Sequence, residues 1–154
     1  MDSTARILIV DDDESIRKVL RTILEEEGYT VETASSGQEA IRKSNERFYN
    51  LALIDIRLPD IQGTQLLAMI RDTVPRMVKI IVTGYPSLQN AIEAVNHGAD
   101  AYILKPFNVD KTLDVIKEHL EQQLEAKKYS QQKVAEFIET RAREIEAKTG
   151  PKSR

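Results

Sequence analysis

The sequence predicts an α/β fold: a doubly wound sheet of five parallel strands with helices on both faces. Five short apolar runs alternate with segments whose apolar residues recur at helical spacing. The runs are continuously apolar rather than alternating, as strands covered on both faces require. The links between the segments are short, which favours parallel strands joined by right-handed crossovers.

The five strands are expected where β-branched and aliphatic residues cluster. They cover residues 6–10, 29–34, 51–55, 79–83 and 101–105. In a sheet of this kind, ligands bind beyond the carboxyl ends of the strands, at a topological switch point. The residues that follow each strand are therefore the first place to look for a functional site.

The helices are expected between the strands, each with a recognisable start or stop. They cover residues 14–28, 37–46, 63–73 and 88–97, and a last helix starts after Asn108. Asp13 reads as the N-cap of the first helix, and Gly28 as its C-terminal stop. Ser36 with Glu39 resembles a capping box, and Ser87 can cap the fourth helix.

Composition excludes several classes of protein. The chain has 154 residues, of which 41% are hydrophobic and 31% charged, as in globular domains. The absence of cysteine excludes disulfides, thiolate metal sites and cysteine nucleophiles. The N-terminus does not read as a signal peptide, and no apolar run approaches the ~20 residues of a membrane span. We therefore expect a cytoplasmic protein with no membrane partner.

Charged and hydroxylated side chains end or directly follow four of the five strands. They are Asp11, Asp12, Asp55, Thr83 and Lys105. Carboxylates that converge at one sheet edge repel one another unless a divalent cation joins them, and oxygen-only ligands favour Mg²⁺. Thr83 and Lys105 are suited to hold phosphoryl oxygens, and Asp55 would be a nucleophile that forms an acyl phosphate. Singly, Thr83 could be an ordinary strand end and Lys105 a surface lysine, but four strand ends together favour a site.

The stretches "ILIVDDDE", "LIDIRLPDIQG", "IIVTGY" and "AYILKPF" together resemble the receiver domain of two-component response regulators. The resemblance covers residues 5 to about 122. It implies a flavodoxin-like fold with strand order 2-1-3-4-5. It also implies a cis peptide bond between Lys105 and Pro106.

The resemblance implies a role for each residue of the site. Asp55 would be the phosphoacceptor. Asp12 would bind Mg²⁺ directly, Asp11 would help through water, and the backbone carbonyl of Arg57 would be a further ligand. Lys105 would pair with the phosphate. Thr83 would be the switch hydroxyl, and Tyr102 the switch aromatic that turns inward when Thr83 moves.

The partner that the resemblance implies is a sensor histidine kinase, whose phosphohistidine would be the donor. The domain would catalyse its own phosphorylation and slow hydrolysis and would otherwise not be an enzyme. Its conformation would control an unidentified downstream protein or its own oligomeric state. Gly84 and Tyr85 follow Thr83 near the route of the attacking water, so the lifetime of the phosphate stays open.

The alternative is a phosphatase or phosphotransferase enzyme that uses an Asp nucleophile on a similar sheet. Enzymes of the haloacid-dehalogenase type want a second Asp two residues after the nucleophile. Here that position is Arg57, so the general acid/base is missing. A nucleotide-binding module is disfavoured because no glycine-rich phosphate loop follows any strand.

The chain divides into a receiver domain, residues 1–122, and a helical extension, residues 123–154. Residues 126–154 carry eight Lys/Arg and four Glu, whereas residues 1–125 have a net charge of −7. A continuous helix over residues 109–148 would be roughly 60 Å long. The best heptad register has Leu113, Leu120, Leu124, Val134, Ile138 and Ile145 at core positions, interrupted by Lys117, Lys127, Gln131 and Arg141.

Several roles remain open for this extension. The polar stretch "AKKYSQQK" can be a hinge, after which Val134, Phe137, Ile138 and Ile145 would dock as part of a helical pair. It can equally belong to a signalling helix of a longer protein, of which this chain would be a receiver fragment. A homodimer through the helix is a third expectation. Direct binding of nucleic acid is not expected, because the basic residues alternate with glutamates.

Overall fold

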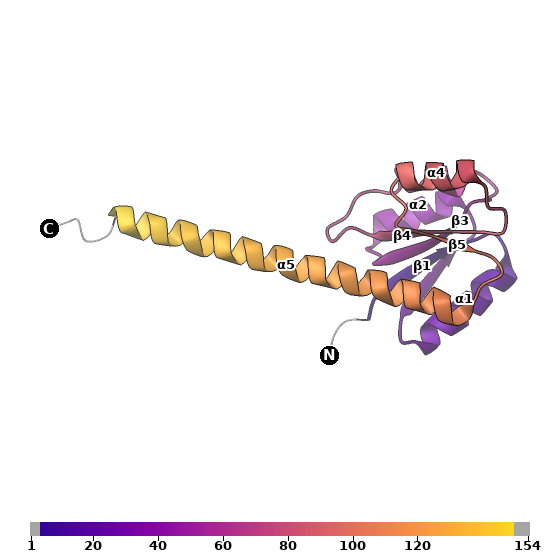
Figure 1. Ribbon diagram of the computed structural model, residues 1–154, viewed down its shortest axis with the longest axis horizontal. Coiled ribbons are helices and arrows are strands. Elements are labelled where there is room, and N and C mark those ends of the chain that lie inside the picture. Colours follow the sequence, from indigo (N-terminus) through magenta and orange to yellow (C-terminus); the bar gives the residue numbers. More distant parts are fainter. Residues whose placement is uncertain (1–3, 150–154) are drawn as a thin grey trace.

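The computed structural model describes residues 4–149, which form a single α/β domain with one projecting helix (Figure 1). The strands are β1 (Arg6–Val10), β2 (Thr30–Ala34), β3 (Leu51–Asp55), β4 (Val78–Thr83) and β5 (Ala101–Leu104). All neighbouring strands are parallel, in the order β2-β1-β3-β4-β5. The predicted doubly wound, flavodoxin-like sheet is therefore confirmed.

Five helices cover the sheet in two layers. They are α1 (Glu14–Glu26), α2 (Gly37–Glu46), α3 (Gly63–Met69), α4 (Leu88–Asn96) and α5 (Val109–Thr149). Leu20 of α1 and Ile116 of α5 belong to the core on one face of the sheet. Ala40 of α2, Leu66 of α3 and Ala94 of α4 belong to the core on the other face (Figure 1). Both faces are thus closed, which explains the continuously apolar strands.

Side-chain caps begin the helices where the sequence predicted them. The Asp13 carboxylate accepts from the backbone N–H groups of Ser15 and Ile16. Ser36 Oγ accepts from the N–H of Glu39, whereas the Glu39 carboxylate accepts from Ser35 rather than from Ser36. These caps satisfy N–H groups that have no partner inside the helix, so they fix where each loop at the sheet edge becomes a helix.

Helix α3 is shorter than the sequence predicted. It ends at Met69 instead of Thr73, because Ile70 leaves the helical conformation with ψ of 133°. Its side chain is buried in the core between the sheet and α2, α3 and α4. Residues 70–77 then form an irregular connection that contains Val74 and Pro75. Core burial of Ile70 outweighs the helical pattern that continues to residue 73.

Helix α5 runs without interruption from Val109 to Thr149, and the predicted hinge in "AKKYSQQK" is helical. Ile116 is buried, and Gln123 is partly buried. The described side chains of α5 after Gln123 are exposed. Beyond this residue the helix leaves the domain and projects away from the body of the protein (Figure 1). Among the described residues, no helix is long and apolar enough to span a membrane.

Gly63 allows the close approach of α3 to the strand that carries Asp55. A Cβ at Gly63 would lie 2.2 Å from the backbone oxygen of Asp55, a contact that backbone atoms cannot relieve without a shift. We expect Gly63→Ala to lower the free energy of unfolding by about 1–3 kcal/mol, the usual cost of overpacking. Urea unfolding followed by circular dichroism measures this change.

Gly84 provides the matched control for Gly63. A Cβ at Gly84 would meet nothing closer than 3.8 Å, so Gly84→Ala should leave the free energy of unfolding nearly unchanged. Equal stability of the two variants would contradict the close approach described for Gly63.

Candidate functional site

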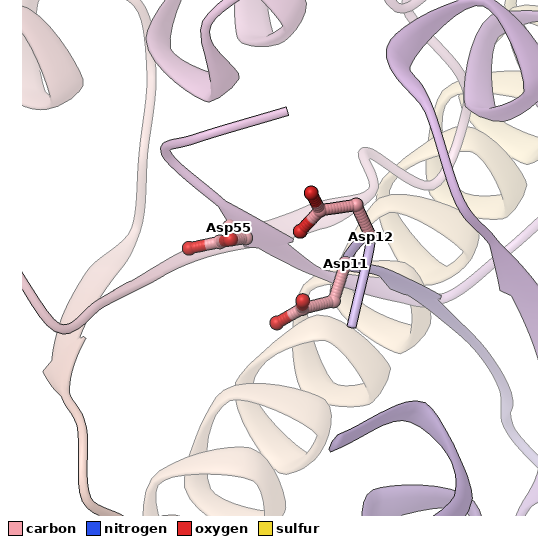
Figure 2. Close-up of side chains that lie close together, drawn as sticks. All are labelled: Asp11, Asp12 and Asp55. Atoms are coloured by element: carbon pink, nitrogen blue, oxygen red, sulfur yellow. The ribbon is translucent and has the colours of Figure 1, made fainter. Parts of the chain in front are cut away.

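Three carboxylates meet at the carboxyl edge of the sheet. Asp11 and Asp12 follow β1, and Asp55 is the last residue of the neighbouring strand β3 (Figure 2). One carboxylate oxygen from each of the three lies within 4.8 Å of the others. Asp11 and Asp55 are 3% and 8% exposed, whereas Asp12 faces solvent. The fold therefore places two nearly buried anions and one exposed anion around a single point.

Lys105 is the cation of this site. Its Nζ lies 2.8 Å from Asp11 Oδ2 and 3.5 Å from Asp55 Oδ1. Burial alone would lower the pKa of Lys105, but hydrogen bonds to and the charges of Asp11 and Asp55 together raise it above the usual value. Lys105 therefore stays protonated and neutralises part of the charge of the carboxylates.

Burial and the charge of Asp11 raise the pKa of Asp55 above that of an ordinary aspartate, and Lys105 offsets only part of this effect. Without a further cation, the ionised form of Asp55 thus lowers the stability of the folded protein. Oxygen ligands are the ones that hard divalent cations such as Mg²⁺ prefer, and all three carboxylates offer oxygens to one position. The residues present therefore fit the predicted cation.

Backbone contacts hold the loop after β1 in place. Asp11 Oδ1 accepts from the N–H of Asp13 at 2.9 Å, and the Arg17 guanidinium donates to the backbone oxygen of Asp11 at 2.8 Å. Asp13 itself caps α1 and is not a member of the cluster. Contacts with the start of α1 thus hold Asp11 in place beside Asp55.

The loop after β3 is tied to two other elements. Asp60 accepts hydrogen bonds from the backbone N–H groups of Gly37 and Gln38 at the start of α2. The Arg57 guanidinium lies over the ring of Tyr85, 3.7 Å from its centroid. The second contact joins the loop after Asp55 to the loop after Thr83 by a cation–π interaction.

Thr83 ends β4 beside this pair and is 1% exposed. Its Oγ1 accepts a hydrogen bond from the N–H of Tyr85 at 2.9 Å. Strand β4 lies next to β3 in the sheet, with Val82 in register with Asp55. The hydroxyl of Thr83 is therefore on the strand adjacent to the carboxylate cluster.

Tyr102 lies on β5 with its side chain against the core between the sheet and α2, α3 and α4. Its hydroxyl is buried and has no hydrogen-bond partner among the described residues. A buried hydroxyl without a partner carries a desolvation cost. Among the described residues, the Tyr102 hydroxyl therefore lacks the hydrogen bond that would offset this cost.

The structure brings four of the predicted site residues together, Asp11, Asp12, Asp55 and Lys105, and shows two contacts that the sequence did not predict. The sequence predicts that Lys105 pairs with a phosphate, and in the structure its Nζ donates to Asp11. No role for the Arg57 side chain is predicted from the sequence, and in the structure it stacks on Tyr85. Both contacts join segments that are far apart in the sequence, and no local pattern reports them. The expected cis peptide bond between Lys105 and Pro106 is present.

The fold and this site define the class of the protein. A profile of the response regulator receiver domain matches residues 7–117, more than two thirds of the chain. The chain therefore belongs to the receiver domain family of two-component response regulators.

Particular relatives support the same assignment. The transcriptional regulatory protein GlrR of Escherichia coli is 37% identical over 118 residues, which are 77% of this chain and 27% of that protein. A CheY-like receiver domain protein of Methanospirillum hungatei JF-1 has 50% identity and a TM-score of 0.77, with 80% of this chain and 99% of that chain covered. The beryllofluoride-activated NtrC4 receiver domain dimer has 39% identity and a TM-score of 0.71, with coverage of 77% and 98%. The chain spans about a quarter of the length of the curated relatives it matches.

The raised pKa of Asp55 has a consequence for stability. Because the folded-state pKa exceeds the unfolded one, ionised Asp55 destabilises the fold at neutral pH. In a chelator, we expect Asp55→Asn to raise the free energy of unfolding at pH 7. This gain should shrink as the pH falls through the raised pKa toward about 4, where the unfolded carboxylate also becomes protonated. Urea titrations across this pH range measure the effect.

Asp72→Asn is the control for this comparison, because Asp72 is an exposed carboxylate outside the cluster. It should show no comparable gain. Addition of Mg²⁺ should reduce the advantage of Asp55→Asn, since a bound cation stabilises the wild type alone. A variant less stable than the wild type at pH 7 in chelator would contradict the electrostatic account of the site.

Proposed function

We propose that Asp55 accepts a phosphoryl group from the phosphohistidine of a sensor histidine kinase. The observation that carries this proposal is the position of Asp55, which ends a buried strand among Asp11, Asp12 and Lys105. Ligand-binding sites in sheets of this kind lie at that edge. A carboxylate with a rigid backbone and a cationic neighbour, Lys105, is suited to act as the nucleophile.

The transfer forms one bond and breaks one. A carboxylate oxygen of Asp55 attacks phosphorus, the bond from phosphorus to the histidine nitrogen breaks, and an acyl phosphate remains on Asp55. The transition state needs alignment and charge neutralisation more than covalent help from the protein. Lys105 Nζ, 3.5 Å from Asp55 Oδ1, is placed to stabilise the phosphoryl oxygens, and Thr83 can donate its hydroxyl to them.

The acidic cluster supports Mg²⁺ as the cofactor of this step. Asp12, Asp55 and the backbone carbonyl of Arg57 would be direct ligands, and Asp11 would contribute through water. When bound, Mg²⁺ would supply positive charge to the carboxylates and to the phosphoryl oxygens. The exposed position of Asp12 keeps one side of the cluster open to solvent and to a donor.

The switch would use Thr83 and Tyr102. Phosphorylation would draw the Thr83 hydroxyl toward the new oxygens and away from the N–H of Tyr85, its present partner. The space around Thr83 would change, and the unpartnered hydroxyl of Tyr102 makes that residue ready to respond. The surface formed by α4 and β5 would report the change, because Tyr102 lies on β5.

The output of this receiver would pass to a downstream protein or to its own oligomeric state. The printed names of several relatives describe transcriptional regulators, of which this chain matches about a quarter. Residues 124–148 of α5 carry six Lys/Arg and five Glu, so this part of the helix has almost no net positive charge. Any binding of nucleic acid would therefore belong to a part of such a regulator other than the receiver.

Phosphorylation is tested with Mg²⁺ and a small phosphodonor such as acetyl phosphate. We expect an acid-stable, hydroxylamine-labile phosphate on the wild type and none on Asp55→Asn, read by intact-protein mass spectrometry. Asp72→Asn should be labelled as efficiently as the wild type, because Asp72 is exposed and outside the site. If Asp55→Asn is labelled as strongly as the wild type, Asp55 is not the phosphoacceptor.

The pair formed by Arg57 and Tyr85 should control how long the phosphate lasts. The two side chains join the loop after Asp55 to the loop after Thr83. In this position they would restrict the approach of water to the phosphate. Loss of the ring in Tyr85→Ala should shorten the lifetime of the phosphoprotein several-fold. Tyr85→Phe keeps the ring and should retain the wild-type lifetime. Decay is measured as the loss of labelled protein over time. Equal decay rates for the wild type, Tyr85→Ala and Tyr85→Phe would contradict this role.

A further inference from the structure

The face of α5 that packs against the domain continues beyond it. Ile116 is buried, and Leu120 packs against the same core. Eighteen residues make five turns of an α-helix, so Val134 and Ile138 lie on the same face as Ile116 and Leu120. Beyond the domain this face is uncovered, and Val134, Phe137 and Ile138 are 56%, 66% and 61% exposed.

A helix in water is stabilised mainly by packing its apolar face. The opposite face of the extension is already suited to solvent, because Arg143 forms an ion pair with Glu139 there. The extension projects away from its own domain, which therefore cannot cover the apolar side (Figure 1). Among the described residues, Val134, Phe137 and Ile138 are therefore left exposed for a partner to cover.

The charges along the extension indicate which partner fits. Residues 126–136 contain three lysines and one glutamate, whereas residues 136–146 contain four glutamates and two arginines. The first stretch therefore carries a net charge of +2 and the second a net charge of −2. A second copy that runs in the opposite direction, with residue 136 at the centre, places these two stretches side by side.

We propose that the extension of α5 pairs with a second copy of this chain in an antiparallel two-helix dimer centred near residue 136. In this register Val134 faces the second copy's Ile138, and the two Phe137 side chains lie close to the two-fold axis. Gln131 faces the second copy's Arg141. The most apolar part of the extension is thus at the centre, where burial is greatest.

A parallel pair would be worse for the same sequence. Residues at the same position meet in a parallel pair, so Lys127 and Arg141 would each face an identical charge at the seam. Like charges that are brought together and desolvated are destabilising. The antiparallel register avoids both of these contacts and keeps the contact between Val134 and Ile138.

A hollow beside the helix agrees with this arrangement. It has a volume of about 560 Å³ and lies between the 74–76 connection and the face of α5 that includes Lys127 and Gln131. Val74 at its border is fully exposed. In the antiparallel register, residues 141–146 of the second copy run beside residues 126–131 and seat at this hollow. Glu144 of the second copy would then lie near Lys127.

The dimer goes beyond the proposed phosphoacceptor function and does not require phosphorylation. It is therefore tested on the unphosphorylated chain, so that its failure and the failure of the phosphoacceptor assignment are separate results. Sedimentation equilibrium at micromolar to 100 µM concentrations should show a dimer. A monomer throughout this range would overturn the proposal.

Two variants on opposite faces of the helix test the contact face. Ile138→Glu places a charge in the centre of the pair and should raise the dimer dissociation constant at least tenfold. Gln132→Glu adds the same side chain on the opposite, solvated face and should leave dimerisation unchanged. Both residues are exposed and outside the domain, so the fold should survive, as circular dichroism can verify. Equal effects of the two substitutions would contradict the proposed face.

The direction is tested by spin labels, which the absence of native cysteine makes specific. In Lys127→Cys the two labelled backbone positions would be roughly 27 Å apart along an antiparallel pair, at 1.5 Å per residue, and side by side in a parallel pair. In Ala135→Cys they are close in either direction, which verifies that labelled dimers are measured. A short distance for both variants by electron double resonance would establish a parallel pair and overturn the proposal.

Discussion

The meeting of three carboxylates at one sheet edge is the constraint on which the rest of the structure depends. Asp11 and Asp55 are almost fully buried, and burial together with the charge of Asp11 raises the pKa of Asp55. Anions in this position destabilise the fold unless cations compensate them. Lys105 compensates part of the charge, and a divalent cation fits the remainder. The charge state of this edge therefore affects the stability of the fold.

The surrounding loops keep this arrangement rigid. Gly63 lets α3 approach the backbone of Asp55, and Asp60 ties the same loop to the start of α2. Arg57 and Tyr85 connect it to the loop after Thr83. The loop after Asp55 is therefore in contact with the start of α2, with α3 and with the loop after Thr83.

Helix α5 joins the core of the domain to an exposed extension. Its first part contributes Ile116 to the core, and its later part carries exposed apolar residues on the same face. A movement of α5 against the sheet would be transmitted along a continuous helix. The division of basic and acidic residues along the extension gives a second copy of the chain a preferred direction.

The sequence by itself determined the five strands, the starts of all five helices and the residues at the sheet edge. These features are local, because they depend on apolar runs, caps and the residue that follows each strand. Tertiary structure decided the end of α3 at Met69, where burial of Ile70 outweighs helical periodicity. It also decided that Lys105 rests on Asp11 and that Arg57 stacks on Tyr85. Those contacts join residues that only folding brings together, so their partners cannot be read from neighbouring positions.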